Sequence, residues 1–198
     1  AGPIGEVSDE IWDTHFEINV RGYFLTVREA VRVMKDQHRG TIVFNSSKGA
    51  FAPTVDNAPY ASSKAAVAAL ARNLAAELGP HGVRVNYFNA DFIDTPMMRR
   101  LIDQRAAQKG ISTQTQIEEY RSRNLLGIGP IPASAVAEAA LFLASPRSGY
   151  TTGAAITTPS PSSAWLTRTP GLRLLVSTFT RHADGTDRPK FHFYPHPW

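Results

Sequence analysis

The segment from residue 41 to residue 88 constrains the fold most. It begins with the β-branched and aromatic run "TIVFN" (41–45) and ends with a second such run, "VRVNYF" (83–88), and both are typical of short buried strands. Between them, residues 58–78 are rich in helix formers and are followed by Gly79-Pro80, a helix stop. In a strand–helix–strand unit the crossover helix makes the two strands parallel. We therefore expect an α/β fold with a doubly wound parallel sheet.

The flanking segments add further helices and one more strand. Ser8 is a typical helix N-cap, so a short helix is expected to follow it. From Val20 to Gln37 apolar residues recur every three or four positions, which predicts an amphipathic helix. Farther along, the sequence predicts three more helices and then a final strand, within residues 95–111, 113–126, 132–145 and 151–158 respectively.

Residues 159–198 differ in character from the rest of the chain. They contain six prolines in 40 residues and show no sustained hydrophobic period, which is typical of a segment that forms no packed core. Only "LRLLVSTF" (172–179) resembles a strand. We interpret residues 1–158 as one domain and 159–198 as an irregular tail that is disordered, the product of a reading-frame shift, or a natural extension.

Charge and cysteine content restrict the classes of function. The net charge is +4, but five basic and only two acidic residues lie within 159–198, so residues 1–158 are nearly neutral and nucleic-acid binding is not expected. The chain has no cysteine, which removes disulfides and thiolate metal sites, and we expect a cytoplasmic protein. No apolar run approaches the roughly 20 residues of a membrane span. His192 and His196 lie among prolines without acidic partners, so no metal site is expected.

Three types of polar residue near the first strand could carry acid–base chemistry. Tyr60 and Lys64 are four positions apart on a predicted helix, so their side chains share a face. A free phenol is a weak base at neutral pH, and a neighbouring ammonium favours the phenolate. Ser46 and Ser47 are expected just beyond the strand end, where open α/β sheets bind ligands. Chance alone gives such a tyrosine–lysine pair in roughly 15% of chains of this composition, and roughly 1% when a serine at a fixed position is also required.

Together with their flanks, these residues resemble the classical short-chain dehydrogenase/reductase family. Its serine stands thirteen residues before the Tyr-x-x-x-Lys motif, which here selects Ser47. The resemblance extends over about residues 1–158 through "NVRG", "GVRVN" and "TTGAAI", at residues 19–22, 82–86 and 151–156. It implies the C-terminal, catalytic portion of an NAD(P)-binding Rossmann-like domain, with the first βαβ units missing.

The resemblance also implies a role for each matching residue. Tyr60 would exchange a proton with the substrate, Lys64 would favour its phenolate and hold the cofactor ribose, and Ser47 would hydrogen-bond the substrate oxygen. Asn19 would fix a water in a proton relay behind Lys64. For Asn19 a helix N-cap, and for Ser47 a plain turn-forming role, are the alternatives. Ser46 and Lys48 are expected to be bystanders, with Lys48 on the solvated surface.

The cofactor implied by the resemblance is NAD or NADP. The backbone of Ile93 would meet its carboxamide and Thr95 would also contact it. The family's glycine-rich phosphate loop is expected upstream of Ala1, as is the residue that selects between the two cofactors. Ala90-Asp91 replaces the family's Pro-Gly, so a side chain and a charge stand where glycine allows close backbone approach. A weaker resemblance, to the dehydrogenase domain of bifunctional aldolase/dehydrogenase proteins, is carried by "NAD", "SSKGAFAP" and "IEEYRSRNLL", at residues 89–91, 46–53 and 117–126.

Two functions follow as alternatives. The first is an NAD(P)-dependent oxidoreductase that interconverts a secondary alcohol and a carbonyl in a small molecule, for which a sugar or polyol metabolite is one candidate. The second is a catalytically silent fragment, at most a packing or oligomerisation module. The family's main dimer contacts come from helices at positions 20–37 and 58–78, so a homo-oligomer, a dimer or tetramer, is expected of the full-length parent.

Overall fold

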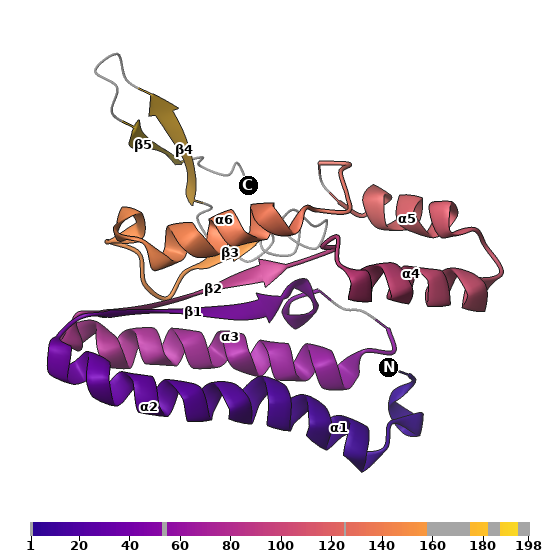
Figure 1. Cartoon of the computed structure of the whole chain (residues 1–198), viewed down its shortest axis with the longest axis horizontal. Coiled ribbons are helices and arrows are strands. Elements are labelled where there is room, and N and C mark those ends of the chain that lie inside the picture. Colours follow the sequence, from indigo (N-terminus) through magenta and orange to yellow (C-terminus); the bar gives the residue numbers. More distant parts are fainter. Residues whose placement is uncertain (1, 53–54, 125, 158–174, 182–186, 194–198) are drawn as a thin grey trace, which may run out of the picture. The chain divides into compact units, whose positions relative to one another are not determined.

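The computed structural model describes residues 2–52, 55–124, 126–157, 175–181 and 187–193. The chain divides into two compact units, Ala1–Pro161 and Ser162–Trp198. In the first unit, β1 (Gly40–Ser47) and β2 (Val83–Ala90) pair in parallel along their whole length. The short strand β3 (Ala155–Thr157) continues the sheet on the other side of β2, again in parallel (Figure 1). This arrangement confirms the predicted parallel sheet.

Strand β1 is longer than the sequence predicted. Its apolar run ends at Phe44, yet pairing continues through Ser46 and Ser47, which lie opposite Asn89 and Ala90. The two serines are therefore the last residues of the strand and do not follow it. The polar Ser46 is tolerated at 2% exposure because its hydroxyl donates to the main-chain oxygen of Lys64 at 2.9 Å.

A continuous helical run precedes β1. It consists of α1 (Asp9–Phe16), a π-helical turn (Glu17–Arg21) and α2 (Gly22–Gln37), where the sequence predicted two separate helices. Ser8 caps the run as predicted, since its hydroxyl accepts a hydrogen bond from Ile11 N at 3.3 Å. The π-helical turn absorbs an extra residue at the junction and keeps the helix unbroken.

The remaining helices lie close to their predicted positions. The crossover helix α3 spans Ala58–Leu78, as the sequence predicted. After β2 come α4 (Pro96–Lys109), α5 (Thr113–Ser122) and α6 (Ala133–Ala144). Short 3-10 turns occupy Ile4–Glu6, Lys48–Ala50, Gly79–His81 and Pro146–Ser148.

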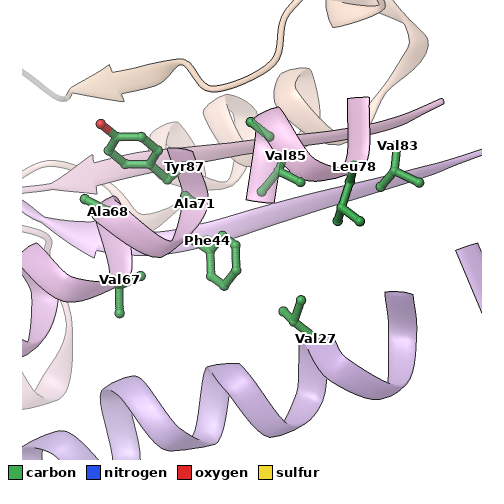
Figure 2. Close-up of a cluster of buried hydrophobic side chains, with 10 residues drawn as sticks. Val27, Phe44, Val67, Ala68, Ala71, Leu78, Val83, Val85 and Tyr87 are labelled. Atoms are coloured by element: carbon green, nitrogen blue, oxygen red, sulfur yellow. The ribbon is translucent and has the colours of Figure 1, made fainter. Parts of the chain in front are cut away.

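Helices cover both faces of the sheet. α3 packs against β1 and β2, with α2 beside it, whereas α6 lies over the opposite face of the same two strands (Figure 1). The fold is therefore the doubly wound α/β arrangement that the βαβ pattern predicted. Figure 2 shows the core between α2, α3 and the sheet, whose labelled side chains are Val27, Phe44, Val67, Ala68, Ala71, Leu78, Val83, Val85 and Tyr87.

Arg84, near the start of β2, forms hydrogen bonds with several segments of the chain. Its guanidinium donates hydrogen bonds to Ser148 Oγ at 2.8 Å and to Thr41 Oγ1 at 3.0 Å. It also reaches three main-chain oxygens, those of Leu143, Ser145 and Thr151. One side chain on β2 thus connects β1, the end of α6 and the segment that leads into β3.

In the second unit, β4 (Leu175–Arg181) and β5 (Asp187–Phe193) form an antiparallel pair. β4 overlaps the segment 172–179, which the sequence singled out as resembling a strand, whereas β5 was not predicted. The other residues of 159–198, including His196, lie outside the described part of the chain. The boundary at residue 158 and the nature of the tail stay predictions.

Candidate active site

Ser47 stands at the carboxyl edge of the sheet. As the last residue of β1 it is 9% exposed, and its hydroxyl accepts a hydrogen bond from Gly49 N at 3.1 Å. This bond forms within the 3-10 turn Lys48–Ala50 that directly follows the strand. The same hydrogen bond therefore forms the turn and fixes the hydroxyl. A turn-forming role of Ser47 is thus compatible with the predicted hydrogen bond to a substrate.

Tyr60 faces the same small space as Ser47. It lies in the first turn of α3, and the close approach of both residues is visible at Gly49, which has no side chain. A Cβ built on Gly49 would lie 3.6 Å from Ser47 Oγ and 3.8 Å from Tyr60 Cε1. The ring of His15 lies edge-on to the Tyr60 ring, with 5.9 Å between their centroids. The structure thus brings together a serine and a tyrosine that are thirteen residues apart in the sequence.

Lys64 lies one helical turn farther along α3, on the same face as Tyr60. Its Nζ is 5.8 Å from the centroid of the Tyr60 ring and donates a hydrogen bond to the main-chain oxygen of Asn45 at 3.0 Å. Only 7% of the residue is exposed. Burial lowers the pKa of Lys64 below its ordinary value, because the charged form loses hydration.

Asn19 joins this group through an intermediate serine. It lies in the π-helical turn, and its Nδ2 donates to Ser63 Oγ at 3.0 Å, while Ser63 Oγ donates to the main-chain oxygen of Tyr60 at 2.8 Å. The N-cap alternative is wrong, because Asn19 lies inside a continuous helical run. Ser63 was not predicted, although it directly precedes Lys64 and is completely buried.

Tyr23 is a second tyrosine beside Lys64 that sequence reasoning missed. Its hydroxyl donates to the main-chain oxygen of Asn45 at 3.3 Å, the same oxygen that accepts from Lys64, and its ring centroid is 5.7 Å from Nζ. Burial raises the pKa of Tyr23 above its ordinary value. Helical spacing could have indicated Tyr23, because it follows Asn19 by four positions and therefore shares a helix face with it.

Ile93 and Thr95, the residues predicted to contact a cofactor, lie on the segment after β2. Ile93 forms an isolated parallel bridge with Ile131, and Thr95 caps α4 by accepting a hydrogen bond from Met98 N at 3.2 Å. This segment leaves the sheet next to the end of β1, since Ala90 lies opposite Ser47. The structure therefore places Ile93 and Thr95 on a fixed segment that leaves the same edge of the sheet.

The expectation that Lys48 lies on the solvated surface is wrong. Its Nζ forms an ion pair with Asp91 Oδ2 at 3.2 Å, and the two side chains are 19% and 15% exposed. Because the ladder aligns Ser47 with Ala90, the residues that follow each strand become neighbours. The replacement of Pro-Gly by Ala90-Asp91 therefore does not place an unpaired charge at this edge.

The group around Gly49 has the parts needed for proton transfer at an alcohol or carbonyl oxygen. The Ser47 hydroxyl and the Tyr60 ring both lie beside Gly49, and the buried Lys64 ammonium lies near that ring. Among the described residues, no cluster of three or more histidine, cysteine, aspartate or glutamate side chains could hold a metal ion. In the same part of the chain, no helix is both long and apolar enough to cross a membrane.

Comparison with known proteins assigns the family. Residues 1–158 match the sequence model of a family described as enoyl-(acyl carrier protein) reductase. The chain belongs to the short-chain dehydrogenase/reductase family. One relative in this family is an uncharacterized oxidoreductase, YuxG, of Bacillus subtilis, which is 36% identical over 172 residues. That match covers 85% of this chain and 25% of YuxG. Overall, the chain spans between a quarter and about half of the length of such curated relatives.

Solved short-chain dehydrogenase/reductase structures share the fold. Sorbitol-6-phosphate 2-dehydrogenase SrlD from Erwinia amylovora is 27% identical with a TM-score of 0.76, over 82% of this chain and 64% of SrlD. Carveol dehydrogenase from Mycobacterium avium, solved in complex with NAD, is 29% identical with a TM-score of 0.72, over 79% of this chain and 60% of that protein. These similarities confirm the Rossmann-like fold class predicted from the sequence.

Proposed function

We propose that this chain carries the catalytic half of an NAD(P)-dependent oxidoreductase that interconverts a secondary alcohol and a carbonyl. The observation that carries the proposal is the convergence of Ser47 and Tyr60 on the space beside Gly49, with Lys64 Nζ 5.8 Å from the Tyr60 ring. Each of these residue types matches one need of the reaction. A hydroxyl holds the reacting oxygen, a phenol exchanges the proton, and an ammonium favours the phenolate.

In this proposal Tyr60 is the general acid and base. As a phenol it donates its proton to the carbonyl oxygen during reduction, and as a phenolate it accepts the hydroxyl proton during oxidation. Ser47 donates a hydrogen bond to the same oxygen, and the turn Lys48–Ala50 keeps its hydroxyl in place. Because one N–H and one main-chain turn fix Ser47, little reorganisation is needed when the substrate arrives.

The residues present fit a nicotinamide dinucleotide. Lys64 Nζ has three N–H donors, and its hydrogen-bond acceptor among the described residues is the Asn45 oxygen. Two donors therefore remain for ribose hydroxyls, and Tyr60, Ile93 and Thr95 would provide the other contacts. The cofactor, NAD or NADP, supplies the hydride when bound. The NAD complex of the related carveol dehydrogenase supports this assignment.

Asn19 is proposed as the outer member of the proton relay. It would fix a water behind Lys64, and its link to Ser63 holds it against the turn of α3 that carries Lys64. A π-helical turn at this residue supports the proposal, because such turns are frequent at functional sites.

For the substrate we propose a hydroxyl-bearing metabolite of the sugar or polyol type in a cytoplasmic setting. The related Erwinia protein is named for sorbitol 6-phosphate, which supports a polyol. YuxG is about four times longer than the region it shares with this chain, since the match covers 25% of it. That length supports the interpretation that the parent enzyme belongs with bifunctional aldolase/dehydrogenase proteins.

We also propose that the protein acts as a homo-oligomer. The run α1–α2 exposes large apolar side chains, of which Ile18 is 68%, Phe24 48% and Leu25 39% exposed. Exposed apolar residues on neighbouring turns are typical of an interface between protein chains. A dimer or tetramer formed through this helix and α3 would cover them.

Two measurements test the oxidoreductase proposal. Reduced cofactor is titrated against the purified chain by fluorescence. In a protein extended to include the expected upstream phosphate loop, the absorbance of reduced nicotinamide is followed while polyols and secondary alcohols are supplied with NAD or NADP. In the extended protein we expect Tyr60→Phe to remove nearly all turnover and to leave cofactor affinity nearly unchanged. Retained turnover would overturn the role of Tyr60. A chain that binds neither cofactor would favour the alternative, a catalytically silent packing or oligomerisation module.

A further inference from the structure

The ion pair between Lys48 and Asp91 lies at the edge of the sheet that carries the candidate site. Both residues directly follow a strand end, Lys48 after Ser47 in β1 and Asp91 after Ala90 in β2. Ser47 and Ala90 are the last aligned residues of the parallel ladder. The ion pair therefore extends the connection between the two strands by one residue beyond their last main-chain pairing.

On the side of β1, Lys48 belongs to the turn that fixes Ser47. The main-chain oxygen of Lys48 accepts hydrogen bonds from Phe51 N at 2.9 Å and Ala52 N at 3.0 Å. The next residue, Gly49, donates from its main-chain nitrogen to Ser47 Oγ. A displacement of Lys48 would therefore move the donor that holds the serine hydroxyl.

On the side of β2, Asp91 is attached to a rigid segment. Phe92, the next residue, is 3% exposed and its ring stacks on that of Tyr120 in α5 at a centroid distance of 4.7 Å. Ile131 N donates to the main-chain oxygen of Phe92 at 2.8 Å, and Ile93 bridges Ile131. The carboxylate of Asp91 thus projects from a segment that buried contacts hold in place.

The environment of the pair separates it from an ordinary surface salt bridge. Pairs between fully exposed side chains contribute little to stability, because water screens them. Lys48 and Asp91 are 19% and 15% exposed, whereas Lys35 and Glu77, a pair of similar length between α2 and α3, are 34% and 60% exposed. Removing one partner at the sheet edge would leave the other charge largely shielded from water, which costs more than at the surface.

We propose that Lys48 and Asp91 are a positioning pair, which holds the turn that orients Ser47 against the rigid segment after β2. Neither residue needs to touch the substrate for this role. Its catalytic consequence rests on the proposed function of Ser47. The structural part, the coupling of the turn to the ion pair, stands on the contacts alone and is measured without turnover.

The test follows amide hydrogen exchange by NMR in the 198-residue chain. Gly49 N is the donor to Ser47 Oγ, so its exchange rate reports directly on the interaction that orients the serine. We expect Lys48→Met and Asp91→Asn each to accelerate exchange at Gly49 by about fivefold or more, with less than about twofold change at core amides such as that of Val85. The matched control Lys35→Met breaks the more exposed pair and leaves the Gly49 rate unchanged.

Rescue distinguishes positioning from general stabilisation. The double variant Lys48→Asp with Asp91→Lys restores an ion pair of reversed polarity, and we expect its Gly49 exchange to return to within about twofold of the original rate. Equal acceleration throughout the core in the single variants, or an unchanged Gly49 rate, overturns the proposal. If the exchange results hold but Ser47→Ala retains full turnover, the positioning pair stands and the proposed role of Ser47 fails.

Discussion

Lys64 and Tyr23 share one acceptor, the main-chain oxygen of Asn45, which lies 3.0 Å from Lys64 Nζ and 3.3 Å from the Tyr23 hydroxyl. The carbonyl belongs to the part of β1 just before the serine pair. An ammonium and a phenol from two different helices are therefore fixed relative to the strand that carries Ser47. This shared carbonyl connects the three elements that form the candidate site.

Lys64 is predicted to titrate below its ordinary value of about 10.5, because burial disfavours its charged form. The unfolded chain then binds more protons than the folded chain between the lowered pKa and 10.5. The contribution of Lys64 to stability should therefore rise with pH through that window and be smallest below it. NMR titration of the lysine Cε and Nζ signals gives the pKa directly, and urea unfolding over the same pH range gives the stability.

Lys64→Met is the matched variant, because it keeps the side-chain length and removes the titrating group. We expect its stability curve to lack the rise attributed to Lys64. A pKa at or above 10.5 for Lys64 in the folded chain would contradict the prediction.

Tyr23→Phe should destabilise the fold by about 0.5–1 kcal/mol. The change removes one hydrogen bond to the Asn45 oxygen and keeps the ring that packs edge-on against Phe44 at 5.3 Å. Urea unfolding at neutral pH measures the loss. Tyr150→Phe is the control, because Tyr150 is fully exposed, and equal effects of the two substitutions would argue against the Asn45 contact.

Arg84→Lys is expected to cost about 2–3 kcal/mol of unfolding free energy. A lysine keeps the charge but cannot reach the five acceptors that the planar guanidinium contacts from two nitrogens. Chemical denaturation of the variant gives the value. Arg100→Lys, at an exposed position on α4, should change the unfolding free energy by less than about 0.5 kcal/mol, and a similar small effect at Arg84 would refute its bridging role.

Ile18→Glu should weaken self-association. Ile18 is 68% exposed, so a glutamate at this position is compatible with the folded chain. In an interface formed by the run α1–α2, however, the charge of that glutamate would be buried, which is unfavourable. Analytical ultracentrifugation should show a shift towards monomer. Val55→Glu, at a position that is 85% exposed and lies before α3, is the control and should leave the distribution of species unchanged.

Local patterns were sufficient for much of the fold. The bounds of α3 could be predicted because its helix formers end at a Gly-Pro stop, and the parallel sheet follows from the βαβ connection. The spacing of Ser47, Tyr60 and Lys64 indicated a common site. Tyr60 and Lys64 are four positions apart and share a helix face, and Ser47 lies at the end of the strand that precedes this helix. Here the sequence decided both the elements and the candidate chemistry.

Contacts between distant segments were decided only by the tertiary structure. The pairing of Lys48 with Asp91 and of Asn19 with Ser63 spans 43 and 44 residues, and no local pattern specifies either partner. The strand β1 continues through two serines because β2 aligns with them and Lys64 satisfies Ser46, so pairing outweighs residue polarity. Periodicity and spacing therefore determined most of the elements and the residue types of the candidate site, whereas the register of β1 on β2 and the packing of α3 determined which charges and hydroxyls meet.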